Sequence, residues 1–338
     1  ATPSYAAIID PVIHGLSLEP LKSILEDKSI TKVFHAGYQD IEILYNLFKT
    51  CPFPVFDTQI AAAFSGLGQG LGYEKLIYLL LDIKISKTEQ FTNWLSRPLT
   101  QEQMNYAIHD VLYLKEVYVL LKKRLSSIER FDWPDEYFLE LSNPKNYTIN
   151  PETAWQKLKV PFAKWKHYSI LWDLSCWREK QAQFHNISRN LLINNRLLID
   201  LSCRPFLEKM PLHQFLRSYR HQLDRQDFFE SFFLCYQRAY EMLKKDDDIF
   251  QNRKKIINDW MHRTFQEPLT TTQQQTLNKL KQIIQRVAEE LNIPVSYLAN
   301  KRDLEAFIDK PRSDHKLVLG WRGKVLNSYI DSFLNHVN

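Results

Sequence analysis

One tyrosine and two aspartates have the residue types and positions that metal-dependent chemistry needs. Tyr106 and Asp110 stand four residues apart in a segment with helical spacing, so both side chains fall on one helix face. A carboxylate can bind a hard divalent cation through oxygen, and a nearby phenol can hold a water molecule or help to deprotonate it. On spacing alone, an ordinary surface Tyr–Asp pair is the simpler interpretation.

The second aspartate, Asp40, stands where a short apolar run gives way to a helical pattern. The apolar run ends near His35, and Asp57 occupies the same kind of position after Val55-Phe56. A carboxylate at the start of a helix accepts hydrogen bonds from free amides and complements the helix dipole. Taken singly, both aspartates are therefore interpreted as helix caps.

The elements that would position these residues form an alternating pattern in the first third of the chain. Strands are predicted over 5–10, 31–34 and 55–56, and helices over 18–25 and 40–48. Alternation of this kind indicates an α/β domain with a parallel or mixed sheet. Three short strands make a small sheet, so we expect the domain to be incomplete at its N-terminus.

A single long helix is predicted from Thr100 onward, because apolar residues recur at steps of three and four as far as Leu121. Thr100 and Gln103 have the spacing of a capping box. Four of the eight glycines lie between Gly66 and Gly72, without the strand or the Lys-Ser/Thr helix start of a phosphate-binding loop. This glycine loop is therefore predicted to be a flexible connection between helices.

The remainder of the chain is predicted to be all-helical, because no glycine occurs between Gly72 and Gly320. Prolines among polar residues predict a linker over 131–151. Helical blocks are expected over 152–243 and 270–338, with a charged connecting segment over 244–269.

Charge is distributed unevenly along the chain. Residues 1–150 contain 14 Lys and Arg against 18 Asp and Glu, whereas the remaining residues contain 30 against 21. A basic helical half indicates an anionic partner such as a nucleic acid. The apolar runs are too short for a membrane span, residues 1–30 lack a secretory pattern, and the four cysteines form no CxxC pair. A cytoplasmic location is expected.

Four segments together resemble one enzyme family: His35–Glu42, Phe56–Ala62, Trp94–Thr100 and Tyr106–Val111. Their order and distances resemble the ribonuclease D family, which belongs to the DEDD superfamily of 3′→5′ exonucleases and to its tyrosine subgroup. The resemblance implies an α/β ribonuclease H-like exonuclease domain over 1–130, lacking its first strands. Two all-α HRDC-type helical domains would follow over 152–243 and 270–338, and the chain would be mostly helical.

The resemblance also implies site residues and a reaction. Asp40 would be a metal-ligating or water-bridging carboxylate, Asp110 would hold a divalent metal, and Tyr106 would orient the attacking water. The reaction would be two-metal hydrolysis with Mg²⁺ or Mn²⁺, releasing nucleoside 5′-monophosphates from RNA 3′ ends. Transfer-RNA precursors or other structured RNAs would be the partners, and a monomer is favoured.

One departure from the family pattern limits this expectation. The family's first motif, Asp-x-Glu, should lie N-terminal to Tyr5 and is not in this sequence. With Asp40 and Asp110 alone, two ions would face too few oxygen ligands, so we expect this chain by itself to be inactive or severely impaired. The alternatives are a non-catalytic RNA- or DNA-binding adaptor that retains the exonuclease scaffold, and an exonuclease directed at DNA.

Overall fold

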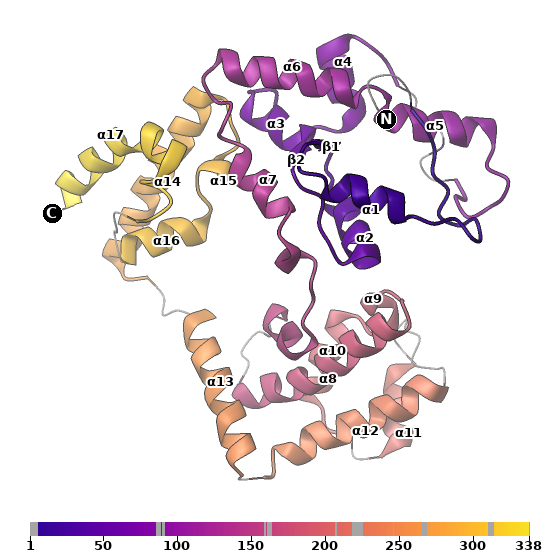
Figure 1. The fold of residues 1–338 in the computed structure, drawn as a ribbon. Coiled ribbons are helices and arrows are strands. Elements are labelled where there is room, and N and C mark those ends of the chain that lie inside the picture. Colours follow the sequence, from indigo (N-terminus) through magenta and orange to yellow (C-terminus); the bar gives the residue numbers. More distant parts are fainter. Residues whose placement is uncertain are drawn as a thin grey trace. The chain divides into compact units, whose positions relative to one another are not determined.

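The computed structural model describes residues 6–85, 89, 92–158, 160, 164–206, 208–217, 226–245, 247–264, 269–309 and 314–337. The chain divides into two compact units, whose elements are labelled in Figure 1. Unit 1 comprises Ala1–Tyr147 and Leu269–Asn338, and unit 2 comprises Thr148–Pro268. Unit 2 is therefore an insertion between two segments that fold together.

The first segment of unit 1 has an α/β architecture. Strands β1 (Lys32–Phe34) and β2 (Val55–Asp57) pair in parallel, with Lys32 opposite Val55 and Phe34 opposite Asp57. Helix α2 (Tyr38–Phe48) connects them. The other helices of this segment are α1 (Glu19–Glu26), α3 (Thr58–Phe64), α4 (Tyr73–Leu81), α5 (Gln101–Leu112), α6 (Leu114–Ser127), α7 (Asp135–Leu141) and the 3-10 turn η1 (Pro144–Asn146).

The strand predicted over 5–10 is wrong for residues 6–10, which are the part of that range that the structure describes. Ile8 and Ile9 are exposed instead of being buried in a sheet. The segment over 6–10 is held at its end by Asp10, whose carboxylate accepts two hydrogen bonds from the Arg97 guanidinium, at 2.6 and 2.7 Å.

The prediction of a single helix from Thr100 to Leu121 is also wrong, because the helix is interrupted at Tyr113, between α5 and α6. The capping box between Thr100 and Gln103 is confirmed. At the break, the Tyr113 amide donates a 3.3 Å hydrogen bond to the hydroxyl of Tyr73, which lies at the start of α4. A contact with a distant helix thus stabilises an interruption that the apolar periodicity of the segment does not reveal.

The C-terminal segment of unit 1 consists of α14 (Thr271–Leu291), α15 (Val295–Leu298), α16 (Lys301–Asp309) and α17 (Gly320–Val337). Its apolar side chains share one core with the α/β segment: Phe64 of α3 packs against Tyr297 and Trp321, with ring centroids 4.7 and 5.5 Å apart. We call residues 269–337 the C-terminal block. The helical domain predicted over 270–338 thus lies in the same compact unit as the α/β segment.

The predicted linker over 131–151 is corrected as well, since it contains α7 and η1. Phe138 of α7 is buried and lies 4.9 Å from Phe56 of β2, measured between ring centroids. Trp133 is also buried and stacks on Trp321. Burial of Trp133 and Phe138 thus stabilises the packing of this segment in the core of unit 1.

The glycine loop connects α3 to α4, as predicted. Gly66, Gly68 and Gly70 adopt positive φ, a conformation that glycine tolerates without steric cost. The carbonyl of Gly66 accepts a 2.8 Å hydrogen bond from the side chain of Asn292, just after α14. The loop is therefore attached to the C-terminal block.

Unit 2 is all-helical, with η2 (Pro151–Lys157), α8 (Trp165–Phe184), α9 (Arg189–Leu192), α10 (Asn195–Cys203), α11 (Lys209–Leu216), α12 (Gln226–Met242) and α13 (Asp248–Thr264). The predicted connecting segment over 244–269 is corrected, because it contains α13. Ile257 of α13 is fully buried, and Arg253 forms an ion pair with Asp173 of α8 at 2.7 Å. Nowhere in the described ranges is a helix long and apolar enough to cross a membrane.

Candidate active site

Asp40 lies in the first turn of α2, immediately after β1. The chain reverses tightly at this point. A Cβ atom at Gly37 would lie only 2.5 Å from the Cβ of Phe34, so the turn requires glycine at this position. Ala36 adopts a positive φ of 53°. Glycine and this backbone conformation together bring the Asp40 side chain to the carboxyl end of the short sheet.

Asp57 supports this turn from the neighbouring strand. Its side chain is buried and accepts hydrogen bonds from the Gln59 amide at 2.8 Å and from the Ile60 amide at 3.2 Å, which confirms the predicted cap of α3. The same carboxylate also accepts from the Gly37 amide at 2.8 Å. Asp57 therefore connects the start of α3 to the start of α2, a second role that spacing did not indicate.

Asp110 and Tyr106 lie one turn apart on α5, as their spacing requires. Asp110 is exposed, whereas Tyr106 is half-buried. The Tyr106 ring is tilted at 54° to the ring of Trp94, with centroids 5.9 Å apart. Trp94 belongs to the segment that precedes α5, so this segment covers one side of the candidate site.

Gln103 holds the segment that carries Trp94 against α5. Its side-chain oxygen accepts from the Thr100 amide at 3.0 Å, and its side-chain nitrogen donates to the Thr92 hydroxyl at 3.0 Å and to the Asn93 carbonyl at 3.3 Å. Gln103 is accordingly buried. The capping-box glutamine thus both caps α5 and positions the Trp94 segment.

The two candidate metal ligands come from different elements, and the charge of one, Asp40, acts on the other, Asp110. Although the Asp110 side chain is exposed, partial desolvation of its carboxyl raises its pKa; His109 lowers the pKa by a smaller amount, and the negative charge of Asp40 raises it slightly. Burial also raises the pKa of Asp40, and the charge of Asp57 adds to this effect. Negative charge therefore accumulates at this site.

Tyr73 is a neighbour of the site that sequence reasoning missed. Burial raises its pKa, and the charge of Asp110 contributes in the same direction. Its ring lies 5.4 Å from that of His35, which follows β1. Its position directly after the glycine loop was visible in the sequence, but nothing there indicated that its hydroxyl accepts from the amide at the α5–α6 break.

The donor set of the site matches a hard divalent cation in kind. Magnesium ions are commonly held by one or two carboxylates, with waters and substrate phosphates as the other ligands. Asp40 and Asp110 could supply such a pair, and a bound cation would favour the ionised form of both carboxylates. Across the described residues, no group of three or more His, Cys, Asp or Glu side chains is placed to hold a metal ion.

Comparison with known proteins identifies the family. Residues 1–126 match the 3′-5′ exonuclease family. The ribonuclease D of Bartonella henselae is 30% identical over 335 residues, which cover 99% of this chain and 79% of the relative. The chain belongs to the ribonuclease D family. The ribonuclease D of Nitrobacter hamburgensis is likewise 30% identical, over 95% of this chain and 80% of that protein.

The fold agrees with this family assignment. The crystal structure of Escherichia coli RNase D, described as an exoribonuclease involved in structured RNA processing, superimposes with a TM-score of 0.70. The two sequences are 22% identical, and the superposition covers 95% of this chain and 83% of the RNase D chain. The chain therefore has the fold of ribonuclease D. Its enzyme class, which the ribonuclease D relatives show, is that of a 3′→5′ exoribonuclease.

Proposed function

We propose that Asp40 and Asp110 bind a divalent cation, Mg²⁺ or Mn²⁺, at the 3′ end of an RNA, and that Tyr106 orients the attacking water. One observation supports this most directly: the pKa of Asp110 on α5 is raised by burial and, to a smaller extent, by the charge of Asp40 on α2. The products would be nucleoside 5′-monophosphates, released one at a time.

Each side chain has a defined task in this hydrolysis. The cation, when bound, would lower the pKa of water and stabilise negative charge on the phosphate. Asp40 and Asp110 would provide its carboxylate oxygens, and the Tyr106 hydroxyl would hold the attacking water in line with the phosphorus. The two-ion reaction that the resemblance implies needs more oxygen ligands than this pair provides, so we expect slow turnover by this chain.

RNA is the proposed partner, with transfer-RNA precursors or other structured 3′ ends as substrates. Unit 2 contains 20 Lys and Arg against 14 Asp and Glu, and the C-terminal segment from 269 onward contains 10 against 7. These basic regions would contact the phosphate backbone. We propose that the reaction takes place in the cytoplasm. The four cysteines support this proposal because each is a free thiol in the structure, as is usual in a reducing compartment.

A non-catalytic adaptor that binds RNA or DNA is the alternative. It would retain the basic helices without needing Asp40, Tyr106 and Asp110 in their present arrangement. The structure favours the enzyme because these residues lie beside buried supports, Asp57 and Gln103, that fix the turns and segments around them.

An RNA assay distinguishes these two functions. The chain, in excess over an oligoribonucleotide labelled at its 5′ end, is incubated with Mg²⁺, with Mn²⁺ or with a chelator. We expect slow shortening from the 3′ end that needs the metal and is lost in Asp110→Asn. Shortening that persists in chelator or in Asp110→Asn would contradict the proposal, and RNA binding without any shortening would favour the adaptor. A matched DNA oligonucleotide tests the choice of nucleic acid.

A further inference from the structure

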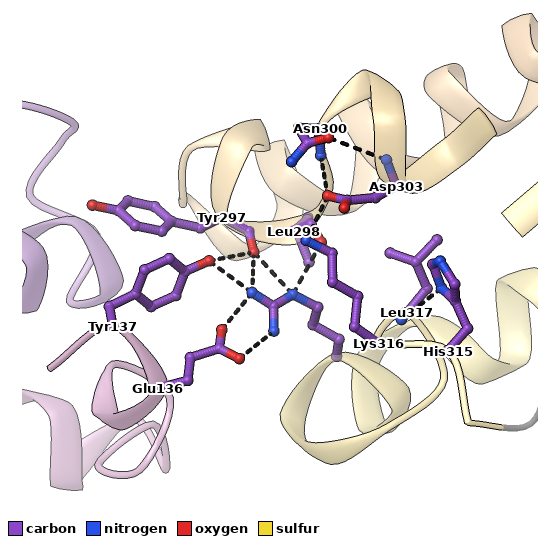
Figure 2. A network of polar contacts seen from close by, with 10 residues as sticks. Glu136, Tyr137, Tyr297, Leu298, Asn300, Asp303, His315, Lys316 and Leu317 are labelled. Carbon is purple, nitrogen blue, oxygen red and sulfur yellow. Dashed lines mark hydrogen bonds and ion pairs between the residues drawn. The ribbon is translucent and has the colours of Figure 1, made fainter. Parts of the chain in front are cut away.

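Arg322 of α17 is almost completely buried, at 4% exposure, in a polar network within unit 1. Its guanidinium donates to the carboxylate of Glu136 at 2.8 Å and to the hydroxyl of Tyr137 at 2.7 Å, both on α7. It also donates to the backbone carbonyls of Tyr297 and Leu298, each at 3.0 Å. Figure 2 shows Glu136 and Tyr137 on one side of this network and Tyr297 and Leu298 on the other.

This network joins the C-terminal block to the α/β segment. Guanidinium nitrogens form a planar set of donors, which suits several acceptors at once and which lysine cannot reproduce. Trp321 adds an aromatic face 4.4 Å from the Arg322 guanidinium carbon. Removing the arginine would leave several acceptors without a donor, so the network strongly favours a single arrangement of α7 against α15 and α17.

Helix α7 connects this network to the strand beside the candidate site. Phe138, the residue after Tyr137, packs on Phe56 of β2 with ring centroids 4.9 Å apart. Phe56 directly precedes Asp57, whose carboxylate accepts from the Gly37 amide at the start of α2. Asp40 lies in that first turn. Side-chain contacts, hydrogen bonds and residues adjacent in the chain therefore form a path from Arg322 to Asp40.

The C-terminal block also contacts the far end of α3, the helix that Asp57 caps. The ring of Phe64, the last residue of α3, packs against Tyr297 and Trp321. Arg130 donates to the carbonyl of Phe64 at 3.2 Å and to that of Leu291, at the end of α14, at 2.8 Å. The segment from β2 to α3 is thus fixed to the C-terminal block, through α7 at one end and directly at the other.

We propose that Arg322 is a positioning residue for the metal site, acting through α7, β2 and Asp57 on the first turn of α2. The C-terminal block would then be part of the catalytic unit, in addition to any contact that it makes with RNA. This inference rests on the proposed role of Asp40 as a metal ligand.

The test compares three variants with the wild-type chain. Arg322→Gln removes the guanidinium and its charge, and Tyr137→Phe removes one hydroxyl while keeping the ring. Arg286→Gln is the matched control, because Arg286 lies in the same block and forms an exposed ion pair with Glu290 at 2.9 Å. Mn²⁺ affinity is measured by electron paramagnetic resonance. Amide hydrogen exchange is followed over 36–41, at a temperature well below unfolding.

We expect Arg322→Gln to weaken Mn²⁺ binding by about 2- to 30-fold, the usual range for remote coupled residues. It should also speed amide exchange over 36–41. Tyr137→Phe should change both quantities in the same direction by less, and it remains informative if Arg322→Gln does not fold. Arg286→Gln should match the wild type.

Two results separate failure of this inference from failure of the proposed function. Exchange over 36–41 that stays at the wild-type rate in folded Arg322→Gln and in Tyr137→Phe overturns the inference, as does an unchanged Mn²⁺ affinity beside a lowered melting temperature. A wild-type chain that binds no Mn²⁺ overturns the proposed metal site, while faster exchange in Arg322→Gln would still support the structural coupling.

Discussion

Burial and, to a smaller extent, the negative charge of Asp40 on α2 raise the pKa of Asp110 on α5, although the two carboxylates are distant in the sequence. This relationship separates the candidate site from a set of unrelated helix caps. A carboxylate whose ionised form is disfavoured by burial and by a second carboxylate would be stabilised by a bound cation. The site's stability should therefore depend on pH and on metal.

Asp110→Asn should stabilise the metal-free chain at pH 7. Because folding raises the pKa of Asp110, stability from this group is present below its ordinary pKa of 3.8 and is lost as the pH rises through the raised value. The variant should melt up to about 3 °C higher than the wild type in chelator, since exposed charges interact weakly. The difference should shrink as the pH falls toward 4. A lower melting temperature at pH 7 would contradict the repulsion.

Asp57→Ala should destabilise unit 1 by about 2–4 kcal/mol. The change removes a helix cap and leaves the buried amide of Gly37 and the half-buried amides of Gln59 and Ile60 without their acceptor. Urea denaturation measures the loss. Asp309→Ala, at an exposed position ending α16, is the control and should change stability by less than about 0.5 kcal/mol. Equal effects in the two variants would exclude the bracing role of Asp57.

Gln103→Ala should lower stability by about 1–2 kcal/mol and release the segment that carries Trp94. The side chain makes two hydrogen bonds to that segment and one to the Thr100 amide at the helix cap. Tryptophan fluorescence quenching by iodide should increase as Trp94 becomes more accessible. The neighbouring Gln101→Ala is the control, because Gln101 is exposed and bonds only to Asn105 among its described partners. Unchanged quenching would show that the segment is held by other contacts.

Tyr106→Phe should slow RNA shortening by about 100-fold while leaving Mn²⁺ affinity unchanged, because the hydroxyl positions water and is not proposed as a ligand. Single-turnover rates with labelled RNA measure this effect. Tyr78→Phe, at an exposed position of α4, should keep the wild-type rate. A Tyr106→Phe rate equal to that of the wild type would remove the tyrosine from the mechanism.

The sequence was informative where local patterns determine structure. The parallel strands near 32–34 and 55–57, the helix that carries Asp40, the cap at Asp57 and the Thr100–Gln103 capping box follow from apolar periodicity and capping chemistry. These signals are local, so they can be interpreted without knowing which distant segments meet.

Features that depend on distant contacts were not predictable in this way. The break at Tyr113 depends on the hydroxyl of Tyr73. The shared core of unit 1 depends on Phe64 meeting Tyr297, and the inclusion of α7 depends on Phe138 meeting Phe56. The resemblance to a family supplied the candidate ligands, whereas the support from Asp57 and Gln103 became visible only in three dimensions.

Mn²⁺ binding by the isolated chain tests the metal site most directly, because it does not depend on turnover. Binding is measured by electron paramagnetic resonance for the wild type, Asp40→Asn, Asp110→Asn and the exposed control Asp309→Asn. We expect one site in the wild type and in the control, weakened at least about tenfold in each of the other variants. Wild-type affinity in both Asp40→Asn and Asp110→Asn would contradict a cation held between these two carboxylates.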